Sequence, residues 1–214
     1  IASRMAVTLI AQQLGEWLPD NRGASMRELR RAMAVGVDAA NRSIFEAANP
    51  TADYHGMGTT LVLAVVHQGE LVLGHAGDSR AYLWREGTLK QLTRDHSLLQ
   101  EQIDSGLLTL AEAAMSSNGN LVTRALGVED LVLLDVQHRP IEEGDLYLLC
   151  SDGLTDMLDD EEIAEELADS TVFDIETRAQ RLIDLANRHG GRDNISVALI
   201  YAREKTDDGL AQLR

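Results

Sequence analysis

The chain opens with two segments in which apolar residues recur at helical spacing. In residues 1–18 the repeat places Ala6, Val7, Ile10, Leu14, Trp17 and Leu18 on one face. In the second segment the apolar face consists of Met26, Leu29, Met33, Val37, Ala40 and Ile44. Ser25 and Glu28 have the spacing of a capping box at its start, and Pro50 lies just past its end. We therefore predict a pair of helices.

Short apolar and β-branched runs follow, separated by turns that contain glycine. They predict strands over residues 59–66, 71–75, 81–84, 89–92, 131–137, 146–150 and 195–201. Helices are predicted over residues 97–105, 161–167 and 175–188. Connections as short as Gln68-Gly69 and Glu86-Gly87 favour antiparallel pairing.

The order of elements is helices, strands, a small helical insertion, strands, helices and a last strand. Runs of one element type indicate an α+β layered domain, in which a pair of sheets is covered by two helix pairs. Within the insertion, Thr109 and Glu112 have capping-box spacing, and residues 115–120 are predicted to be a loop. We find no linker, so we predict a single domain over residues 1–214.

Composition limits the classes of partner. The 214 residues include 35 Asp and Glu against 19 Lys and Arg, and a net charge of -16 repels phosphate backbones and anionic lipid. We therefore expect neither nucleic acid nor a membrane as partner, and no apolar run approaches the ~20 residues of a membrane-spanning helix. The single cysteine, Cys150, lies in an apolar run, which indicates a core residue and fits a reducing, cytoplasmic compartment.

Three aspartates occur where an apolar strand meets a glycine or a turn. Asp78 follows a strand and a glycine, Asp152 lies between a strand and Gly153, and Asp193 lies between a glycine pair and the last strand. If these carboxylates converge, they form an all-oxygen site suited to Mg²⁺ or Mn²⁺. Zinc fits less well, because the usual Cys/His spacing is missing. An Asp beside Gly is more often a plain turn residue, so only the set supports a metal site.

Six segments resemble motifs of bacterial members of the protein phosphatase 2C family, in the family's order and spacing. They are Gly58-Thr59-Thr60, Gly77-Asp78-Ser79-Arg80-Ala81-Tyr82, Leu92-Thr93-Arg94-Asp95-His96-Ser97, Thr123-Arg124-Ala125-Leu126-Gly127, Ser151-Asp152-Gly153-Leu154-Thr155-Asp156 and Gly191-Arg192-Asp193-Asn194-Ile195-Ser196. The resemblance extends from the first helix to Tyr201. Each motif is short, but six in order are not expected by chance.

The resemblance implies a four-layer αββα sandwich of two mainly antiparallel sheets flanked by helix pairs, with a small helical flap at about residues 97–120 that is tied to substrate choice. It also implies hydrolysis of phosphoserine and phosphothreonine in proteins by a water that two divalent cations, Mn²⁺ or Mg²⁺, activate. By position, Asp152 and Asp193 match ligands of the two main ions. Asp78 matches a ligand of a third, weaker ion, to which Asp156 contributes in some members.

The sequence departs from the family at its start. The family's Asp-Gly-Met-Gly-Gly-His motif and its phosphate-binding arginine are not present, and Ile1 falls in the helix that directly follows the motif. We expect the general acid and this arginine to lie before Ile1 in the parent protein. A polypeptide that truly began at Ile1 is expected to have little turnover. The flap also lacks the His-Pro that bacterial members often have near residues 115–117.

Three functional hypotheses remain open at this point. The first is an active phosphatase that opposes a bacterial Ser/Thr kinase, and the second is a non-catalytic module that binds or regulates a phosphoprotein. A third, weaker one is a regulatory phosphatase of anti-sigma-factor antagonists, but those relatives usually lack a full flap. Residues 141–170 contain twelve acidic residues and no basic one. This segment is either a solvated surface or a surface that favours basic substrate loops.

Other polar residues of these motifs are given structural roles. His96 is expected to join the sheet to the flap, and His55 and His75 to be ordinary surface or rim residues. Arg80 and Arg124 are expected to form salt bridges or hydrogen bonds, with Arg80 near Asp78.

Overall fold

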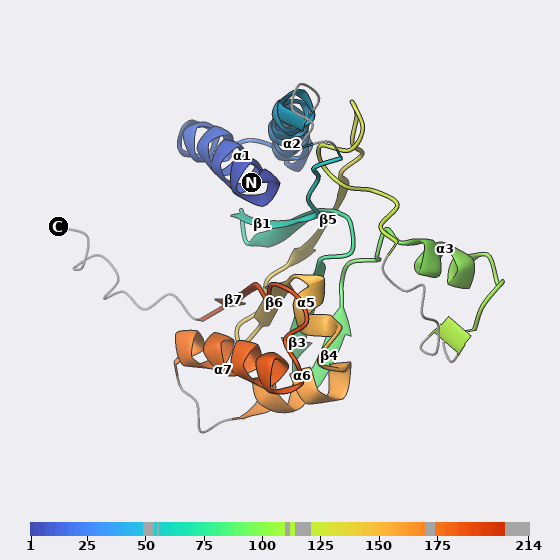
Figure 1. Ribbon diagram of the computed structural model, residues 1–214. Helices are drawn as coiled ribbons and strands as arrows, with labels where there is room; N and C mark the ends of the chain where they lie inside the picture. Colours follow the sequence, from blue (N-terminus) through green and yellow to red (C-terminus); the bar gives the residue numbers. More distant parts are fainter. Residues whose placement is uncertain (49–53, 55, 110–111, 114–120, 170–173, 204–214) are drawn as a thin grey trace. The chain divides into compact units, whose positions relative to one another are not determined.

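The computed structural model describes residues 1–48, 54, 56–109, 112–113, 121–169 and 174–203 (Figure 1). The described helices are α1 (Ala2–Asp20), α2 (Met26–Ala48), α3 (Leu98–Asp104), α5 (Asp152–Thr155), α6 (Asp160–Ala168) and α7 (Ile175–Arg188). The strands are β1 (Leu61–His67), β2 (Glu70–Ala76), β3 (Arg80–Arg85), β4 (Thr88–Gln91), β5 (Asp135–Pro140), β6 (Leu146–Cys150) and β7 (Val197–Tyr201). The chain divides into two compact units, and each contains one sheet.

The first unit comprises Ile1–Arg80 and Thr93–Arg139. Its sheet has the strand order β1-β2-β5, and α1 packs along α2 in the same unit (Figure 1). Strands β1 and β2 are antiparallel, in a register that pairs Leu61 with Ala76. The turn between them has positive φ at Gln68 and Gly69, as the right-handed twist of a two-residue hairpin requires.

The apolar face of α1 differs from the predicted one at Val7. Ala2, Ala6, Ile10 and Leu14 are buried in the core of the first unit, whereas Val7 is 64% exposed. The buried residues recur every four positions, and Val7 lies one position, or about 100°, away from this line. The capping box of α2 is confirmed, because the Glu28 carboxylate accepts the backbone N–H of Ser25 at 2.8 Å.

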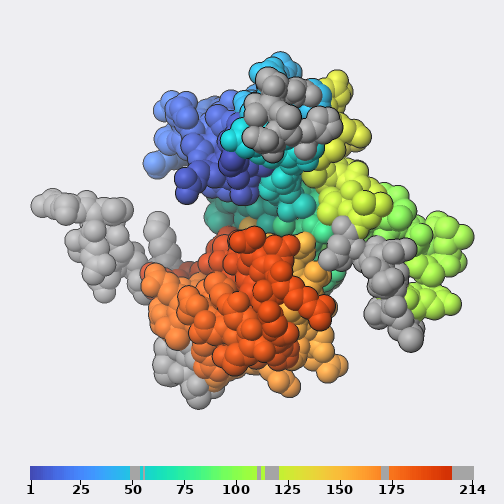
Figure 2. Space-filling model, in the orientation of Figure 1, coloured from blue at the N-terminus to red at the C-terminus, as the bar shows by residue number. Residues whose placement is uncertain are grey.

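The second unit comprises Ala81–Leu92 and Pro140–Arg214, of which residues 170–173 and 204–214 lie outside the described part. Its sheet has the order β4-β3-β6-β7, with β6 and β7 antiparallel and Cys150 paired with Val197. Helix α7 packs against β7 and α6 against β4, so the helix pair and the sheet share one core. Both helices belong to the orange and red surface of this unit in Figure 2.

Several boundaries differ from the predicted ones. Strand β5 begins at Asp135 and not at residue 131, although residues 131–134 are all apolar. Val132 and Leu134 pack against the core while Leu131 and Leu133 are exposed, so an irregular segment also buries every second side chain. Helix α5 was missed because four residues are too few for a helical period. Pro50 and the predicted loop over residues 115–120 lie outside the described residues.

The α+β class is confirmed, since each unit combines helices with a sheet that contains antiparallel pairs. At the base of the predicted flap, the Ser97 hydroxyl caps α3 by accepting the N–H of Gln100, and the Thr109 and Glu112 capping box is present. Among the described helices, none has the length and apolar character needed to cross a membrane. That residues 1–214 form one domain stays a prediction.

Candidate metal centre

The ends of β6 and β7 are joined beyond their last ladder pair by Ser151. The Ser151 N–H donates to the carbonyl oxygen of Ser196 at 3.1 Å. Its hydroxyl donates to the carbonyl oxygen of Asn194 at 3.1 Å and accepts the N–H of Ser196 at 3.0 Å. These three bonds hold the start of α5, where Asp152 is the first residue, against the loop that carries Asp193.

Gly153 makes this close approach possible. A β-carbon at this position would lie 2.4 Å from the carbonyl oxygen of Asn194, closer than such atoms are found in proteins. On the other side of the loop, Gly190 and Gly191 have φ of 129° and 48° and end α7 so that the chain returns toward β7. Both sides of the junction therefore depend on glycine at defined positions.

Three carboxylates at this junction influence one another. Burial raises the pKa of Asp152 above its ordinary value, and the negative charges of Asp156 and Asp193 raise it further. A hydrogen bond from the Gly153 N–H, 2.8 Å from Oδ1 of Asp152, opposes the shift in pKa. Asp156 and Asp193 are exposed, while Asp152 is half-buried. The structure thus brings together Asp152, Asp156 and Asp193, three of the four residues proposed from the sequence.

The Asp193 carboxylate is oriented by the residue that follows it. Its Oδ1 accepts the backbone N–H of Asn194 at 2.6 Å and the Asn194 side-chain amide at 3.2 Å. Such local bonds are typical of an aspartate at a turn. They also fix the direction in which this carboxylate presents its oxygens, so the turn and ligand interpretations do not exclude each other here.

Asp78 belongs to the first unit, in the turn between β2 and β3, and is only 8% exposed. Gly77 before it has a φ of 112°, and a β-carbon there would lie 2.4 Å from Cγ2 of Thr60. The next residue, Ser79, hydrogen-bonds through its hydroxyl to the Thr60 hydroxyl at 2.8 Å. The backbone around Asp78 is therefore tightly constrained.

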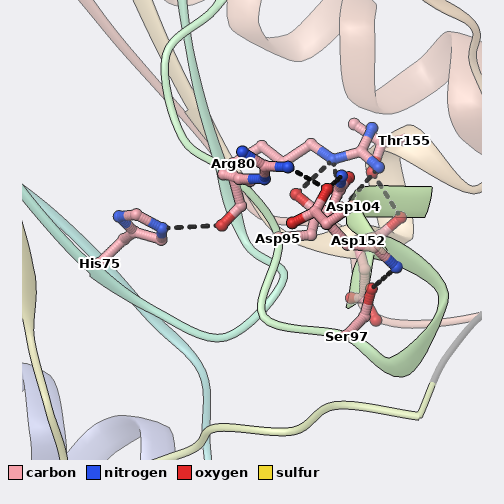
Figure 3. Close-up of polar contacts among 9 residues, drawn as sticks. His75, Arg80, Asp95, Ser97, Asp104, Asp152 and Thr155 are labelled. Atoms are coloured by element: carbon pink, nitrogen blue, oxygen red, sulfur yellow. Dashed lines mark hydrogen bonds and ion pairs between the residues drawn. The ribbon is translucent and has the colours of Figure 1, made fainter. Parts of the chain in front are cut away.

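Arg80 fixes the other end of this turn. Its Nε and Nη2 donate to the Asp95 carboxylate at 3.0 and 2.7 Å, a two-pronged ion pair visible in Figure 3. Arg124 forms a corresponding pair with Asp135 at 2.8 Å and donates to the Leu133 carbonyl. The structural roles predicted for the two arginines are confirmed.

His75 was predicted to be a surface or rim residue, and this is wrong. It is 4% exposed, and its Nε2 lies 3.0 Å from the carbonyl oxygen of Arg94 (Figure 3). Its ring stacks on that of His96 with a centroid distance of 4.7 Å. The alternation along β2 places residue 75 on the opposite face from Gly74, but this strand is buried on both faces, so alternation did not reveal the burial. His55 lies outside the described residues.

His75, His96 and Asp135 have candidate ligand atoms within 4.8 Å of one another, and no other such group of three occurs in the described residues. The two rings are only 9° from parallel. A ligating imidazole directs its lone pair in the plane of the ring, and stacked parallel planes share no position for an ion. Nε2 of His75 and both ring nitrogens of His96 are moreover engaged in hydrogen bonds. In this arrangement the group is a hydrogen-bonded network and not a metal site.

The ligand atoms of Asp152, Asp156 and Asp193 do not all lie within 4.8 Å of one another. An all-carboxylate set of this kind suits Mg²⁺ or Mn²⁺, which bind few protein carboxylates and retain several water ligands. A divalent cation would also offset the repulsion that raises the pKa of Asp152. The residues present therefore fit a hard divalent cation.

Sequence reasoning did not find Ser151, Asn194 or the network around His96. Ser151 stands next to Asp152 in its motif and Asn194 next to Asp193, so proximity to a candidate ligand was the available signal. What each side chain contacts depends on the pairing of β6 with β7, which no local pattern reports.

Comparison with known proteins resolves the family. The family model of protein phosphatase 2C matches residues 1–195. The chain belongs to the protein phosphatase 2C family. It is 36% identical over 209 residues to the serine/threonine phosphatase stp of Listeria monocytogenes, which covers 98% of this chain and 81% of that protein.

Solved structures agree with this assignment. The S. agalactiae serine/threonine phosphatase aligns with a TM-score of 0.85 and 38% identity, covering 95% of this chain and 81% of that one. The catalytic domain of the phosphatase PstP, solved with 2 manganese ions, aligns with a TM-score of 0.76 and 36% identity. The alignment covers 92% of this chain and 80% of that one. The protein is thus a metal-dependent serine/threonine phosphatase, and the hypothesis of a non-catalytic module is not favoured.

Proposed function

We propose that Asp152 and Asp193 hold the two main divalent cations of this phosphatase. The supporting observation is the electrostatic strain at their junction: a half-buried carboxylate whose pKa is raised by burial and by two neighbouring carboxylates. We assign Asp156 a contribution to a third, weaker ion, and Asp78 the role of a ligand of that ion.

The residues of the junction have separate tasks in this proposal. Ser151 holds the loop before β7 against α5, and Gly153 leaves room for the backbone of Asn194. Asn194 orients the Asp193 carboxylate through two hydrogen bonds. When bound, a pair of divalent cations lowers the pKa of the attacking water and offsets charge on the phosphoryl oxygens.

We propose Mn²⁺ or Mg²⁺ as the metal. The likeness to PstP in complex with 2 manganese ions supports manganese. The donor set consists of carboxylates, which are hard oxygen ligands, and this supports both ions over zinc.

We further propose that the substrates are phosphorylated proteins of the cytoplasm, and that the enzyme reverses the action of a bacterial Ser/Thr kinase. The likeness to stp of Listeria monocytogenes and to PhpP of Streptococcus pneumoniae supports this class of phosphatase. The flap over residues 97–120 is expected to contribute to substrate choice within a single catalytic domain. The net charge of -16 opposes binding to nucleic acid or to anionic membranes.

The test replaces each proposed ligand by asparagine in the full-length protein. We expect Asp152→Asn and Asp193→Asn to weaken Mn²⁺ binding, measured calorimetrically, by about 100-fold, and to abolish hydrolysis of a phosphothreonine peptide. Asp156→Asn and Asp78→Asn should raise the Mn²⁺ concentration required for half-maximal rate and leave the tight binding intact.

Asp184→Asn is the matched control, because Asp184 is exposed on α7 and its side-chain bond to a described residue stays within that helix, to Gln180 at 2.9 Å. Its Mn²⁺ affinity and rate should equal those of the unaltered protein. Tight Mn²⁺ binding that survives both Asp152→Asn and Asp193→Asn would contradict the assignment.

A further inference from the structure

We propose that His96 is a positioning residue that holds Asp78 in place through the backbone of Gly77. The inference rests on the role proposed above for Asp78 as a ligand of the weaker ion. The sequence predicts that His96 joins the sheet to the flap, and we infer that this connection also contributes to metal binding.

His96 contacts both sides of Gly77. Its backbone N–H donates to the carbonyl oxygen of Gly77 at 3.0 Å, and its ring Nδ1 accepts the Gly77 N–H at 3.0 Å. Gly77 has a φ of 112°, and Thr60 fills the space where a side chain would stand. Since both polar groups of Gly77 are bound by one residue, the start of the Asp78 backbone is set by His96.

The orientation of the His96 ring is itself determined by its surroundings. Because Nδ1 accepts a hydrogen bond, the ring proton resides on Nε2, which donates to Oδ2 of Asp135 at 3.2 Å. Arg124 holds Asp135 at 2.8 Å, and the stacked ring of His75 covers one face of the imidazole. Three neighbours therefore fix the plane and the tautomer that the contact with Gly77 requires.

The same residue connects to the base of the flap. The carbonyl oxygen of His96 accepts the N–H of Thr123 at 2.9 Å. The adjacent Ser97 caps α3 and pairs with Val122 in an isolated bridge. On the other side, Asp95 is held by Arg80, two residues after Asp78. His96 thus lies where the Asp78 turn and the flap base are joined within the first unit.

Two substitutions separate the two ring contacts. In His96→Asn the amide oxygen takes the position of Nδ1 and can still accept the Gly77 N–H. In His96→Gln the amide nitrogen takes the position of Nε2, so the donor to Asp135 is kept and the acceptor for Gly77 is lost. His138→Gln is the control, because His138 pairs with Glu70 on the surface of the same unit.

The experiment titrates Mn²⁺ in a phosphothreonine-peptide assay of the full-length protein. We expect His96→Gln to require about tenfold more Mn²⁺ for half-maximal rate, with kcat at saturating Mn²⁺ little changed. His96→Asn and His138→Gln should resemble the unaltered protein. Amide hydrogen exchange of Gly77, followed by NMR, should accelerate in His96→Gln and not in His96→Asn.

Equal impairment of His96→Asn and His96→Gln would overturn the proposal, since a purely structural role does not distinguish the two ring nitrogens. If His96→Gln does not fold, Asp135→Ala serves instead, because it frees the ring and leaves His96 in place. It should raise the Mn²⁺ requirement in the same direction, and no change would also overturn the proposal.

Failure of the underlying assignment has a different signature. If Asp78→Asn leaves the Mn²⁺ requirement unchanged while Gly77 exchange still accelerates in His96→Gln, Asp78 is not a ligand. In that outcome the positioning proposal for metal binding falls with it, and only the structural contact between His96 and Gly77 remains.

Discussion

Gly153 and Asn194 approach so closely that a β-carbon on residue 153 would stand 2.4 Å from the Asn194 carbonyl oxygen. The contact joins the start of α5 to the loop before β7, and each of these segments carries a proposed metal ligand. Spacing between Asp152 and Asp193 is thereby set by the backbone, which is stiffer than any side-chain contact.

Replacing Gly153 by alanine tests this relationship. The methyl group meets backbone and not a flexible side chain, so the junction must open. We expect a loss of about 1–3 kcal/mol in unfolding free energy, measured by urea denaturation, and weaker Mn²⁺ binding. Gly23→Ala is the control, because a β-carbon there meets nothing within 4 Å. Equal stability of the two variants would contradict the steric argument.

Replacing Ser151 by alanine removes the hydroxyl that contacts Asn194 and Ser196. The charges of the site stay the same, so any change reports geometry alone. We expect Mn²⁺ affinity to fall by about tenfold, measured by calorimetry. Ser43→Ala, which removes a hydroxyl bonded within α2, should leave affinity unaltered.

Replacing Asp152 by asparagine should have opposite effects on the metal-free and metal-loaded protein. The pKa of Asp152 is raised in the folded state by burial and by Asp156 and Asp193, so its ionised form costs stability. That cost is present above the folded pKa and disappears as the pH falls below the unfolded value of about 3.9.

In EDTA at pH 7 we therefore expect Asp152→Asn to melt at a higher temperature than the unaltered protein, with the gain shrinking toward acid pH. With Mn²⁺ in excess the order should reverse, because the variant loses the stabilisation that metal binding provides. Scanning calorimetry under both conditions measures this. A lower melting temperature of the variant in EDTA would show that the ionised Asp152 carboxylate does not destabilise the metal-free fold.

Replacing Asp145 by asparagine tests its ion pair with Arg85, which includes none of the proposed metal ligands. Asp145 is fully buried, and burial by itself raises its pKa. Hydrogen bonds from Arg85, the Glu142 N–H and the Tyr147 hydroxyl outweigh this effect, so the pKa lies below its ordinary value. Its stabilisation is therefore present above the unfolded pKa and is lost as pH falls through the lowered folded value.

We expect Asp145→Asn to lower the melting temperature at pH 7 by roughly 5–10 °C, because Arg85 is left without its main partner. The variant should also lose less stability on acidification than the unaltered protein does. Tyr147→Phe, which removes one hydrogen bond and no charge, should lower the melting temperature by less. A melting temperature of Asp145→Asn that equals the unaltered value would contradict the assigned role of the pair.

Local patterns predicted most of the elements. Helix α7 and strand β6 have the predicted bounds, since a long amphipathic period and a fully apolar run are strong signals. Both predicted hairpin turns have positive φ at two successive residues. The errors fall where one sequence pattern fits more than one structure. Val7 lies beside the buried line of α1, and residues 131–134 are apolar without forming a strand.

The candidate site was predicted only in part. The motifs identified Asp152, Asp193, Asp156 and Asp78 as candidates, and the family assignment they suggested is confirmed by the match over residues 1–195. The ligand roles of these residues stay predictions. Burial of His75 and its stacking on His96 were not foreseen, because the two residues come from different segments of the chain.

The sequence by itself determined the local conformations and the family, because side-chain periodicity, caps and glycine positions act over a few residues. Tertiary structure decided which charges share an environment. The pKa of Asp152 is raised first by burial, and then by the charges of Asp156 and of Asp193, which the pairing of β6 with β7 brings to it. Gly77 is held by His96 because a loop from beyond β4 returns to it. Such contacts join distant segments, and their energies depend on packing and burial that no local pattern contains.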